Sequence, residues 1–367
     1  MAAPPIAFVW ESLGPSHLDR IEAAAAAGFE VTAIEFSSQS RDYQWERAEP
    51  AGARQVTLAR SGERLGALAL GWRLFRAVRK ARSQAAFLCH YHEPAVFLAA
   101  ILLRLVGCRV FAMIDSKFDD YPRVLWREAG KTLMLAPYHG VLAGSRRTAE
   151  YMHLLGFRRR PAVGGFDALD LARIRKALPA APEPAHAARD FLIVARLVPK
   201  KNLPFALRAY AEWNRQAAHP RLLRIVGYGA EEESLRALAA ELDIADRVVL
   251  TGPAESAQVY AAMGSALCLI LPSTEEQFGL VVIEALALGL PVLVSANAGA
   301  VDELVDNGVN GWIVDPHRPA ALVAAMALLD RDEARWRQAS AAATDSAERG
   351  DVRHFVTGVR TLLGMSR

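Results

Sequence analysis

The stretch Leu271-Pro272-Ser273-Thr274-Glu275-Glu276-Gln277-Phe278-Gly279-Leu280-Val281-Val282-Ile283-Glu284 decides the fold. The apolar run 266–271 that leads into it has the length and composition of a buried strand, and the Pro-Ser-Thr loop ends that strand. Small and apolar residues from 278 to 288 then predict a buried helix, which Gly289 ends. Strand, short loop and helix in this order are the repeating unit of a parallel α/β sheet.

Two glutamates, Glu276 and Glu284, stand on either side of the expected helix N-terminus. Free backbone N–H groups and the positive end of the helix dipole favour an anion at that point. A flanking carboxylate suits a ligand rich in hydroxyl groups. A phosphate attached to a sugar meets both requirements, so the segment predicts a sugar-phosphate site.

This segment resembles the Glu-x7-Glu signature of retaining glycosyltransferases of family 4, from the Pro-Ser loop to the closing Gly-Leu-Pro-Val. The resemblance implies an α/β fold with two Rossmann-like domains in the GT-B arrangement and a donor site in the interdomain cleft. It also implies transfer of a sugar from a nucleotide-diphosphate donor, such as a UDP- or GDP-sugar, to an acceptor hydroxyl.

A second motif, Val194-Ala195-Arg196-Leu197-Val198-Pro199-Lys200-Lys201-Asn202-Leu203, follows another apolar run. It is similar to the family's Val-Gly-Arg-Leu-x-x-x-Lys-Gly segment, with Ala195 and Asn202 in place of the two glycines. The resemblance implies that Arg196 and Lys201 neutralise the donor diphosphate and the leaving nucleoside diphosphate. The alternative is a pair of solvated surface cations.

The resemblance also assigns roles around the helix N-terminus. Glu284 would bind the ribose hydroxyls, and Glu276 the sugar hydroxyls near the reacting carbon. The backbone amides of Phe278 and Gly279 would hold the sugar. Those of Leu280 and Val281 would hold the distal phosphate. Gly227, in a strand-end Gly-x-Gly, is either a nucleotide contact or an ordinary turn. Glu284 has the alternative of a carboxylate satisfied among packed helices.

The length of 367 residues predicts two domains, because a single core usually stops growing at roughly 250–300 residues. Strand and helix signals alternate in both halves, which favours parallel, doubly wound sheets. Three prolines between 178 and 184 predict a linker. We therefore expect an acceptor-binding domain over 1–177, a nucleotide-sugar domain over 185–350 and a terminal helix over 351–367; by resemblance to GT-B enzymes, this helix packs back on the first domain.

The first half departs further from the family pattern. Its first loop carries only Gly14, where many relatives have Gly-Gly, but we expect the loop still to approach a phosphate of the donor. His17 is either an acceptor-side group or a helix cap. Asp115 stands where many relatives have a histidine, so it is a candidate catalytic residue or a turn-forming aspartate. His90 and His92 have the spacing of metal ligands, but alternation along a strand explains them better.

Charge is unevenly distributed along the chain. Residues 1–175 hold 24 Lys+Arg against 17 Asp+Glu, and the remaining residues hold 19 against 23. An Arg-rich amphipathic helix over 65–82 predicts either peripheral contact with an anionic membrane or a crossover helix packed on its own sheet. No nucleic-acid motif is present. The three cysteines have no metal-ligand spacing and predict buried, free thiols.

The sequence therefore predicts a cytoplasmic retaining glycosyltransferase, with contact at the inner face of the cell membrane as an extension. The expected acceptor is a glycan or lipid-linked molecule, in polysaccharide, lipopolysaccharide or other glycoconjugate biosynthesis. We expect no cofactor and no divalent metal, because two cations and helix amides supply the positive charge. The alternatives are transfer to a small metabolite and a non-catalytic subunit that binds a nucleotide-sugar.

Overall fold

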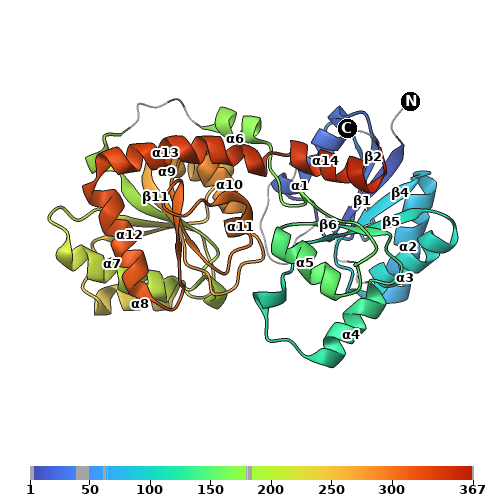
Figure 1. Cartoon of the computed structure of the whole chain (residues 1–367), viewed down its shortest axis with the longest axis horizontal. Coiled ribbons are helices and arrows are strands. Elements are labelled where there is room, and N and C mark those ends of the chain that lie inside the picture. The colour runs from blue at the N-terminus through green and yellow to red at the C-terminus, as the bar shows by residue number, and fades with distance from the viewer. Residues whose placement is uncertain are drawn as a thin grey trace. The chain divides into compact units, whose positions relative to one another are not determined.

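The computed structural model describes residues 4–38, 49–60, 63, 65–178, 180 and 184–365. The chain divides into two compact units, the first made of residues 1–170 with 351–367 and the second of residues 171–350. Each unit is an α/β domain built on a parallel sheet (Figure 1).

The sheet of the first unit has the strand order β3-β2-β1-β4-β5-β6-β7, and every described pairing in it is parallel. Its strands are β1 (Pro5–Trp10), β2 (Glu30–Glu35), β3 (Arg54–Thr57), β4 (Ala85–Leu88), β5 (Arg109–Ile114), β6 (Gly140–Ala143) and β7 (Ala162–Gly164). Alternate residues of β1 point to opposite faces, so Phe8 and Trp10 join one hydrophobic cluster, and Ala7 and Val9 join another.

Helices cover both faces of this sheet. They are α1 (Pro15–Ala26), α2 (Ala67–Lys80), α3 (Pro94–Leu105), α4 (Leu125–Met134), α5 (Arg146–Leu154) and α14 (Arg353–Leu362), with the 3-10 turn η1 (Phe118–Asp120). The terminal helix α14 lies beside α1 and against β6 and β7 (Figure 1). There Arg109 donates to the backbone carbonyls of Leu362 and Leu363, and Phe355 is fully buried.

The sheet of the second unit has the order β10-β9-β8-β11-β12-β13, again parallel. Its strands are β8 (Asp190–Val194), β9 (Leu223–Val226), β10 (Val248–Gly252), β11 (Ala266–Leu271), β12 (Val292–Ser295) and β13 (Gly311–Val314). Its helices are α6 (Leu171–Ala177), α7 (Leu203–Gln216), α8 (Glu232–Glu241), α9 (Ser256–Ser265), α10 (Leu280–Ala287), α11 (Ala300–Leu304), α12 (Pro319–Arg331) and α13 (Glu333–Ala347), with the 3-10 turns η2 (His186–Ala188), η3 (Pro199–Lys201) and η4 (Glu348–Gly350).

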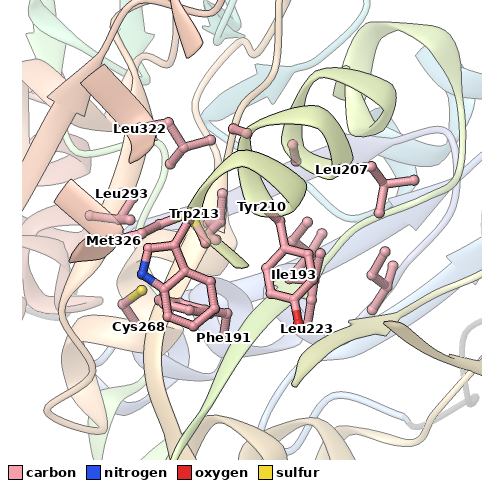
Figure 2. Close-up of a cluster of buried hydrophobic side chains, with 14 of the residues drawn as sticks. Phe191, Ile193, Leu207, Tyr210, Trp213, Leu223, Cys268, Leu293, Leu322 and Met326 are labelled. Atoms are coloured by element: carbon pink, nitrogen blue, oxygen red, sulfur yellow. The ribbon is translucent and has the colours of Figure 1, made fainter. Parts of the chain in front are cut away.

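Figure 2 shows the core on one face of this sheet, where α7 packs on the strands. Trp213 of α7 lies edge-on to Phe191 of β8, with ring centroids 4.7 Å apart. Tyr210 also packs against Phe191, and its hydroxyl donates to the Arg221 carbonyl at 2.5 Å, which satisfies its buried polar atom. This core fixes the position of β8, the strand that leads into the Arg-x4-Lys motif.

Strand order reverses at one place in each sheet, between β1 and β4 and between β8 and β11. Ligands of open parallel sheets bind beyond the carboxyl ends of the strands at such a switch point. The motifs that the sequence singled out in the second half follow β8 and β11, so the topology brings them to the same edge.

The unit boundary differs from the expected one at residue 177. Helix α6 belongs to the second unit because it packs on α9 and α10, and Arg175 donates to the Ala287 carbonyl. The predicted proline linker falls largely outside the described residues, since 179 and 181–183 are not placed. The three cysteines are free and buried, as predicted.

Candidate active site

The loops after β8 and β11 meet through an ion pair between Lys201 and Glu276. Lys201 ends the 3-10 turn η3, and Glu276 lies in the loop between β11 and α10. Ser273 also donates to the same Glu276 oxygen at 2.9 Å. The charged side chains are only 14% and 13% exposed, so their attraction is less screened than on an open surface.

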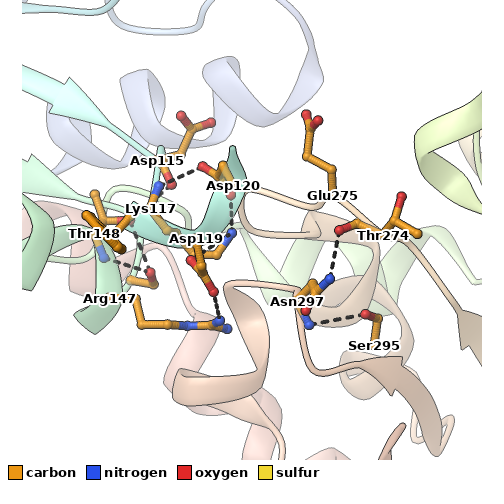
Figure 3. Close-up of polar contacts among 12 residues, drawn as sticks. Asp115, Lys117, Asp119, Asp120, Arg147, Thr148, Thr274, Glu275, Ser295 and Asn297 are labelled. Atoms are coloured by element: carbon orange, nitrogen blue, oxygen red, sulfur yellow. Dashed lines mark hydrogen bonds and ion pairs between the residues drawn. The ribbon is translucent and has the colours of Figure 1, made fainter. Parts of the chain in front are cut away.

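A second set of contacts fixes the backbone of the same two loops. The Thr274 amide donates to the Lys200 carbonyl at 2.9 Å, and Lys200 is 3.4 Å from Glu275. Asn297, after β12, donates its side-chain amide to the Thr274 carbonyl at 2.7 Å, and its backbone amide donates to Ser295 (Figure 3). No sequence motif contains Asn297, whose only signal is its place just beyond the apolar run that begins at Val292.

Gly279 directly precedes helix α10 and has a positive φ of 100°, a conformation that residues with a side chain rarely adopt. The observed helix therefore starts at Leu280, two residues later than predicted. Leu280 and Val281 occupy its first turn, where backbone amides have no partner within the helix. Phe278 is buried, and its carbonyl accepts from the Ala300 amide at 2.9 Å. The four residues assigned by resemblance to amide contacts thus lie together at one helix N-terminus.

Glu284 lies on the second turn of α10 and has a defined partner. Tyr260 of α9 donates its hydroxyl to Glu284 at 3.2 Å, and Arg173 of α6 lies 3.4 Å from the same hydroxyl. Burial, with the Glu284 charge next in importance, raises the pKa of Tyr260 to about 12, so this group stays a hydrogen-bond donor. Tyr260 was not predicted from the sequence, because no sequence pattern shows that α9 and α10 bring Tyr260 and Glu284 together.

Gly227 lies where the loop after β9 crosses the loop after β8. A Cβ at Gly227 would lie 1.8 Å from the Ala195 carbonyl oxygen, and one at Gly229 would lie 2.3 Å from the Leu197 carbonyl oxygen. Because of this close backbone packing, the chain needs glycine at Gly227.

Asn202 has a positive φ of 55°, a conformation that glycine adopts readily and asparagine tolerates, which explains how it replaces a family glycine. Arg196, directly after Ala195, is half-buried in this packed loop.

In the first unit, His17 caps the first helix. The Gly14 amide donates to His17 Nδ1 at 2.9 Å, and the His17 amide donates to the Gly14 carbonyl. Burial first, then the nearby Arg20 and His90, hold the pKa of His17 well below its usual range, so its ring is neutral. Of the two alternatives for His17, the capping one is present, and it does not exclude the other.

Asp115 follows β5 at the carboxyl edge of the first sheet, and burial raises its pKa. Asp167, which the sequence analysis missed, approaches it across Gly144: a Cβ on Gly144 would lie 2.3 Å from Asp167 Oδ2 and 3.2 Å from the Asp115 Cα. Arg20 lies 3.2 Å from Asp167 Oδ1, while Oδ2 is buried and has no hydrogen-bond partner among the described residues. Burial, and secondarily the Asp115 charge, raise the pKa of Asp167 to about 7.

The acidic pair Asp119 and Asp120 is engaged within the first unit (Figure 3). Asp120 pairs with Lys117, and Asp119 lies 2.6 Å from Arg147. Strand β4 ends at Leu88, so His90 and His92 lie in a loop, and the expected alternation along a strand is wrong. Among the described residues, no group of three or more His, Cys, Asp or Glu has the geometry to hold a metal ion.

Comparison with solved structures defines the fold class. Sucrose-phosphate synthase from Thermosynechococcus elongatus matches with a TM-score of 0.76 at 20% identity, over 98% of each chain. HepE from Anabaena, in complex with UDP and glucose, matches with a TM-score of 0.75 at 17% identity, over 98% of this chain and 99% of that one. The predicted α/β fold with two parallel-sheet domains of the GT-B class is confirmed.

Comparison of sequences adds a family match that covers most of the second unit. Residues 175–346 match the family model of glycosyl transferases group 1. The D-inositol 3-phosphate glycosyltransferase of Acidothermus cellulolyticus is 38% identical over 148 residues, which are 38% of this chain and 32% of that relative. The match thus spans about a third of that relative's length. None of the helices in the described ranges is both long and apolar enough to cross a membrane.

Proposed function

We propose that this chain is a retaining glycosyltransferase that moves a sugar from a nucleotide-diphosphate-sugar donor to an acceptor hydroxyl. The observation that carries the proposal is the Lys201–Glu276 pair beside the N-terminus of α10, at the switch point between β8 and β11. Cations, helix amides and carboxylates gather there on loops from two neighbouring strands. This is the set of groups that a sugar diphosphate requires.

Each group has a proposed role in binding and reaction. Arg196 and Lys201 bind the diphosphate and stabilise the negative charge that develops as the nucleoside diphosphate leaves. The amides of Leu280 and Val281 hold the distal phosphate, and those of Phe278 and Gly279 hold the sugar. Glu276 binds hydroxyls near the reacting carbon. The departing phosphate itself takes the acceptor proton, so no protein base is needed. The two cations and the helix amides supply the positive charge, so no divalent metal is needed.

Glu284 is proposed to bind the ribose, with Tyr260 holding its carboxylate in place at 3.2 Å. HepE, which shares the fold, has been crystallised with UDP and glucose, which supports a UDP-sugar among the candidate donors. We propose a glycan or lipid-linked acceptor in glycoconjugate biosynthesis. A small metabolite is the second candidate, favoured by the similarity to an inositol 3-phosphate glycosyltransferase.

Hydrolysis and thermal-shift measurements with UDP-, GDP- and dTDP-sugars test the proposal. We expect one donor class to stabilise the protein and to be hydrolysed slowly in the absence of acceptor. A ligand at 100 times its Kd stabilises by about 2.7 kcal/mol, which is readily measured. Stabilisation without turnover, also with a panel of acceptors, would instead indicate a non-catalytic nucleotide-sugar-binding subunit.

A further inference from the structure

Helix α4 of the first unit exposes three large apolar side chains, more than α2 (Leu68 and Trp72), α3 (Leu105) or α5 (Leu154). Leu125 is 90% exposed, Trp126 71% and Leu133 67%, and no residue of α4 is buried. Phe118, Tyr121 and Val124, just before the helix, are also exposed. We call these six residues the α4 patch. Exposed apolar residues that cluster in this way mark sites of interaction.

The polar side of α4 is the one that faces its own unit. Glu128 accepts from the Tyr151 hydroxyl and from Lys131 at 2.9 Å, and it lies 3.6 Å from Arg123. Lys131 also donates to the Tyr151 hydroxyl at 2.8 Å, and Tyr151 is buried on α5. An ordinary surface helix buries its apolar stripe and exposes its charges. In α4 Met134 packs against the core, but the charged side chains also face the unit and the large apolar side chains Leu125, Trp126 and Leu133 face outward.

Charge around the α4 patch favours an anionic partner. Every acid from 117 to 134 is paired with a cation: Asp119 with Arg147, Asp120 with Lys117, and Glu128 with Lys131. Arg127, in contrast, lies over the Trp126 ring, 5.2 Å from its centroid. The patch therefore presents aromatic and aliphatic groups with a positive charge beside them. Leu with Trp on one side and arginine nearby is the composition of helices that lie at the lipid headgroup boundary.

We propose that the α4 patch inserts into the headgroup region of an anionic membrane. This inference deepens the proposed function, on whose lipid-linked acceptor it rests, by naming the surface that meets the lipid. It differs from the sequence-based expectation, which placed membrane contact on the helix over 65–82. That helix, α2, buries Gly71, Leu74 and Val78 and packs along α3, as a crossover helix does.

Vesicle sedimentation tests the proposal on the full chain. Wild type is compared with the double variant Leu125→Glu/Trp126→Glu, using vesicles of phosphatidylcholine alone and of phosphatidylcholine with phosphatidylglycerol. We expect binding to the anionic vesicles and at least about tenfold weaker binding by the double variant, equivalent to about 1.4 kcal/mol. Trp126→Phe should keep most of the affinity because the apolar contact remains.

Leu105→Glu is the matched control, since Leu105 of α3 is 78% exposed but lies outside the patch. It should bind as wild type does. Arg76→Glu/Arg79→Glu tests the rival surface on α2. The proposal is overturned if the double variant binds anionic vesicles as wild type does, or if only the α2 variant loses binding. It is also overturned if wild type binds neutral vesicles equally well, or binds neither kind of vesicle. If wild type is a dimer in solution and the double variant is a monomer, a second copy of the chain covers the α4 patch, and the membrane proposal is also overturned.

Nucleotide binding measured without vesicles keeps the two proposals apart. UDP or GDP stabilisation should be unchanged by Leu125→Glu/Trp126→Glu, because this patch belongs to the first unit and the Lys201–Glu276 site to the second. Unchanged stabilisation also shows that the variant is folded. If wild type binds neither UDP nor GDP, the proposed function is contradicted, and the vesicle result then tests the membrane proposal alone.

Discussion

At the scale of single residues, the two glutamates of the Glu-x7-Glu motif differ in what holds them. Glu276 pairs with Lys201 in the loop after β11, whereas Glu284 accepts from Tyr260 on a helix face. If Glu284 binds the ribose, its loss weakens the donor equally in the ground and transition states, so Glu284→Ala should raise the donor KM. If Glu276 acts near the anomeric carbon, Glu276→Ala should mainly lower kcat. Each effect should be about 10- to 150-fold, the value of one hydrogen bond to a charged group.

Steady-state kinetics and titration with nucleoside diphosphate separate these roles. Tyr260→Phe is the control for Glu284, because it keeps the carboxylate and removes the 3.2 Å hydrogen bond to it, together with the 3.4 Å contact of the hydroxyl with Arg173. It should raise the donor KM by less than Glu284→Ala. Wild-type turnover and wild-type nucleotide affinity in both glutamate variants would show that the motif does not bind a donor.

Asp167 makes stability depend on pH through its buried carboxyl group. Its pKa is about 7 in the folded chain against an ordinary 3.8, so the folded state keeps a proton that the unfolded chain loses. The resulting stability is complete below about pH 4 and is lost as the pH rises through about 7. Asp167→Asn cannot titrate, so the stability of the variant relative to wild type should increase with pH. The change should be on the order of a few kcal/mol.

Urea unfolding of wild type and Asp167→Asn at about pH 5 and about pH 8 measures this difference. In Asp115→Asn the pH dependence should weaken, because the neighbouring charge that helps to raise the pKa of Asp167 is gone. The opposite sign, with wild type gaining stability relative to Asp167→Asn as the pH rises, would mean that the Arg20 ion pair dominates over burial.

Sequence reasoning located the residues that lie in motifs and missed those that tertiary packing brings to them. The family resemblance assigned Lys201 to the donor diphosphate and Glu276 to the donor sugar, and the structure pairs the two side chains. Tyr260, Asn297 and Asp167 lie far from their partners along the chain, outside any motif. Nothing in a single sequence shows which side chains will meet across a sheet edge.

At the scale of elements, substitution of Gly227 tests whether the loops after β8 and β9 must pack as closely as they do. Gly227→Ala should displace the Ala195 loop, because the new Cβ would lie 1.8 Å from the Ala195 carbonyl oxygen. We expect destabilisation of about 1–3 kcal/mol and weaker nucleotide binding, measured by urea unfolding and by titration. Gly252→Ala is the control: the φ of Gly252 is also positive, at 75°, but apart from its two chain neighbours no described residue has an atom within 4 Å of the new Cβ. Equal losses in both variants would attribute the effect to backbone strain alone.

The elements found from sequence are those with long apolar runs. Strand β11 is buried at every residue and was predicted over almost the same residues. Strands β3 and β7 have only four and three residues, none of them buried, so they give no apolar run to detect. Helix α4 shows a further limit: its amphipathic spacing is visible in the sequence, but spacing alone cannot tell which side faces the protein.

At the scale of the whole molecule, the fold is matched over 98% of the chain at only 20% identity. Such a match requires a repeated pattern of buried strands and covering helices rather than particular residues. The proposed site residues Arg196, Lys201 and Glu276, in contrast, occupy loop positions after strands, where ligands of parallel sheets bind. This explains why the sequence motifs of the second unit carry the family match while the first unit is recognised by its fold.

The proposed independence from divalent metal concerns the molecule as a whole, and we expect it from the way positive charge is supplied at the proposed site. Lys201, Arg196 and the N-terminus of α10 provide positive charge, and the acidic pair Asp119 and Asp120 is already bound to Arg147 and Lys117. Sugar transfer should therefore be unchanged by EDTA and by added magnesium or manganese. Lys201→Ala should lower kcat, and an added metal should not restore it, because the side chains described near it form no metal-binding cluster. Activity abolished by EDTA and recovered with magnesium would require a metal at the diphosphate and would refute this charge assignment.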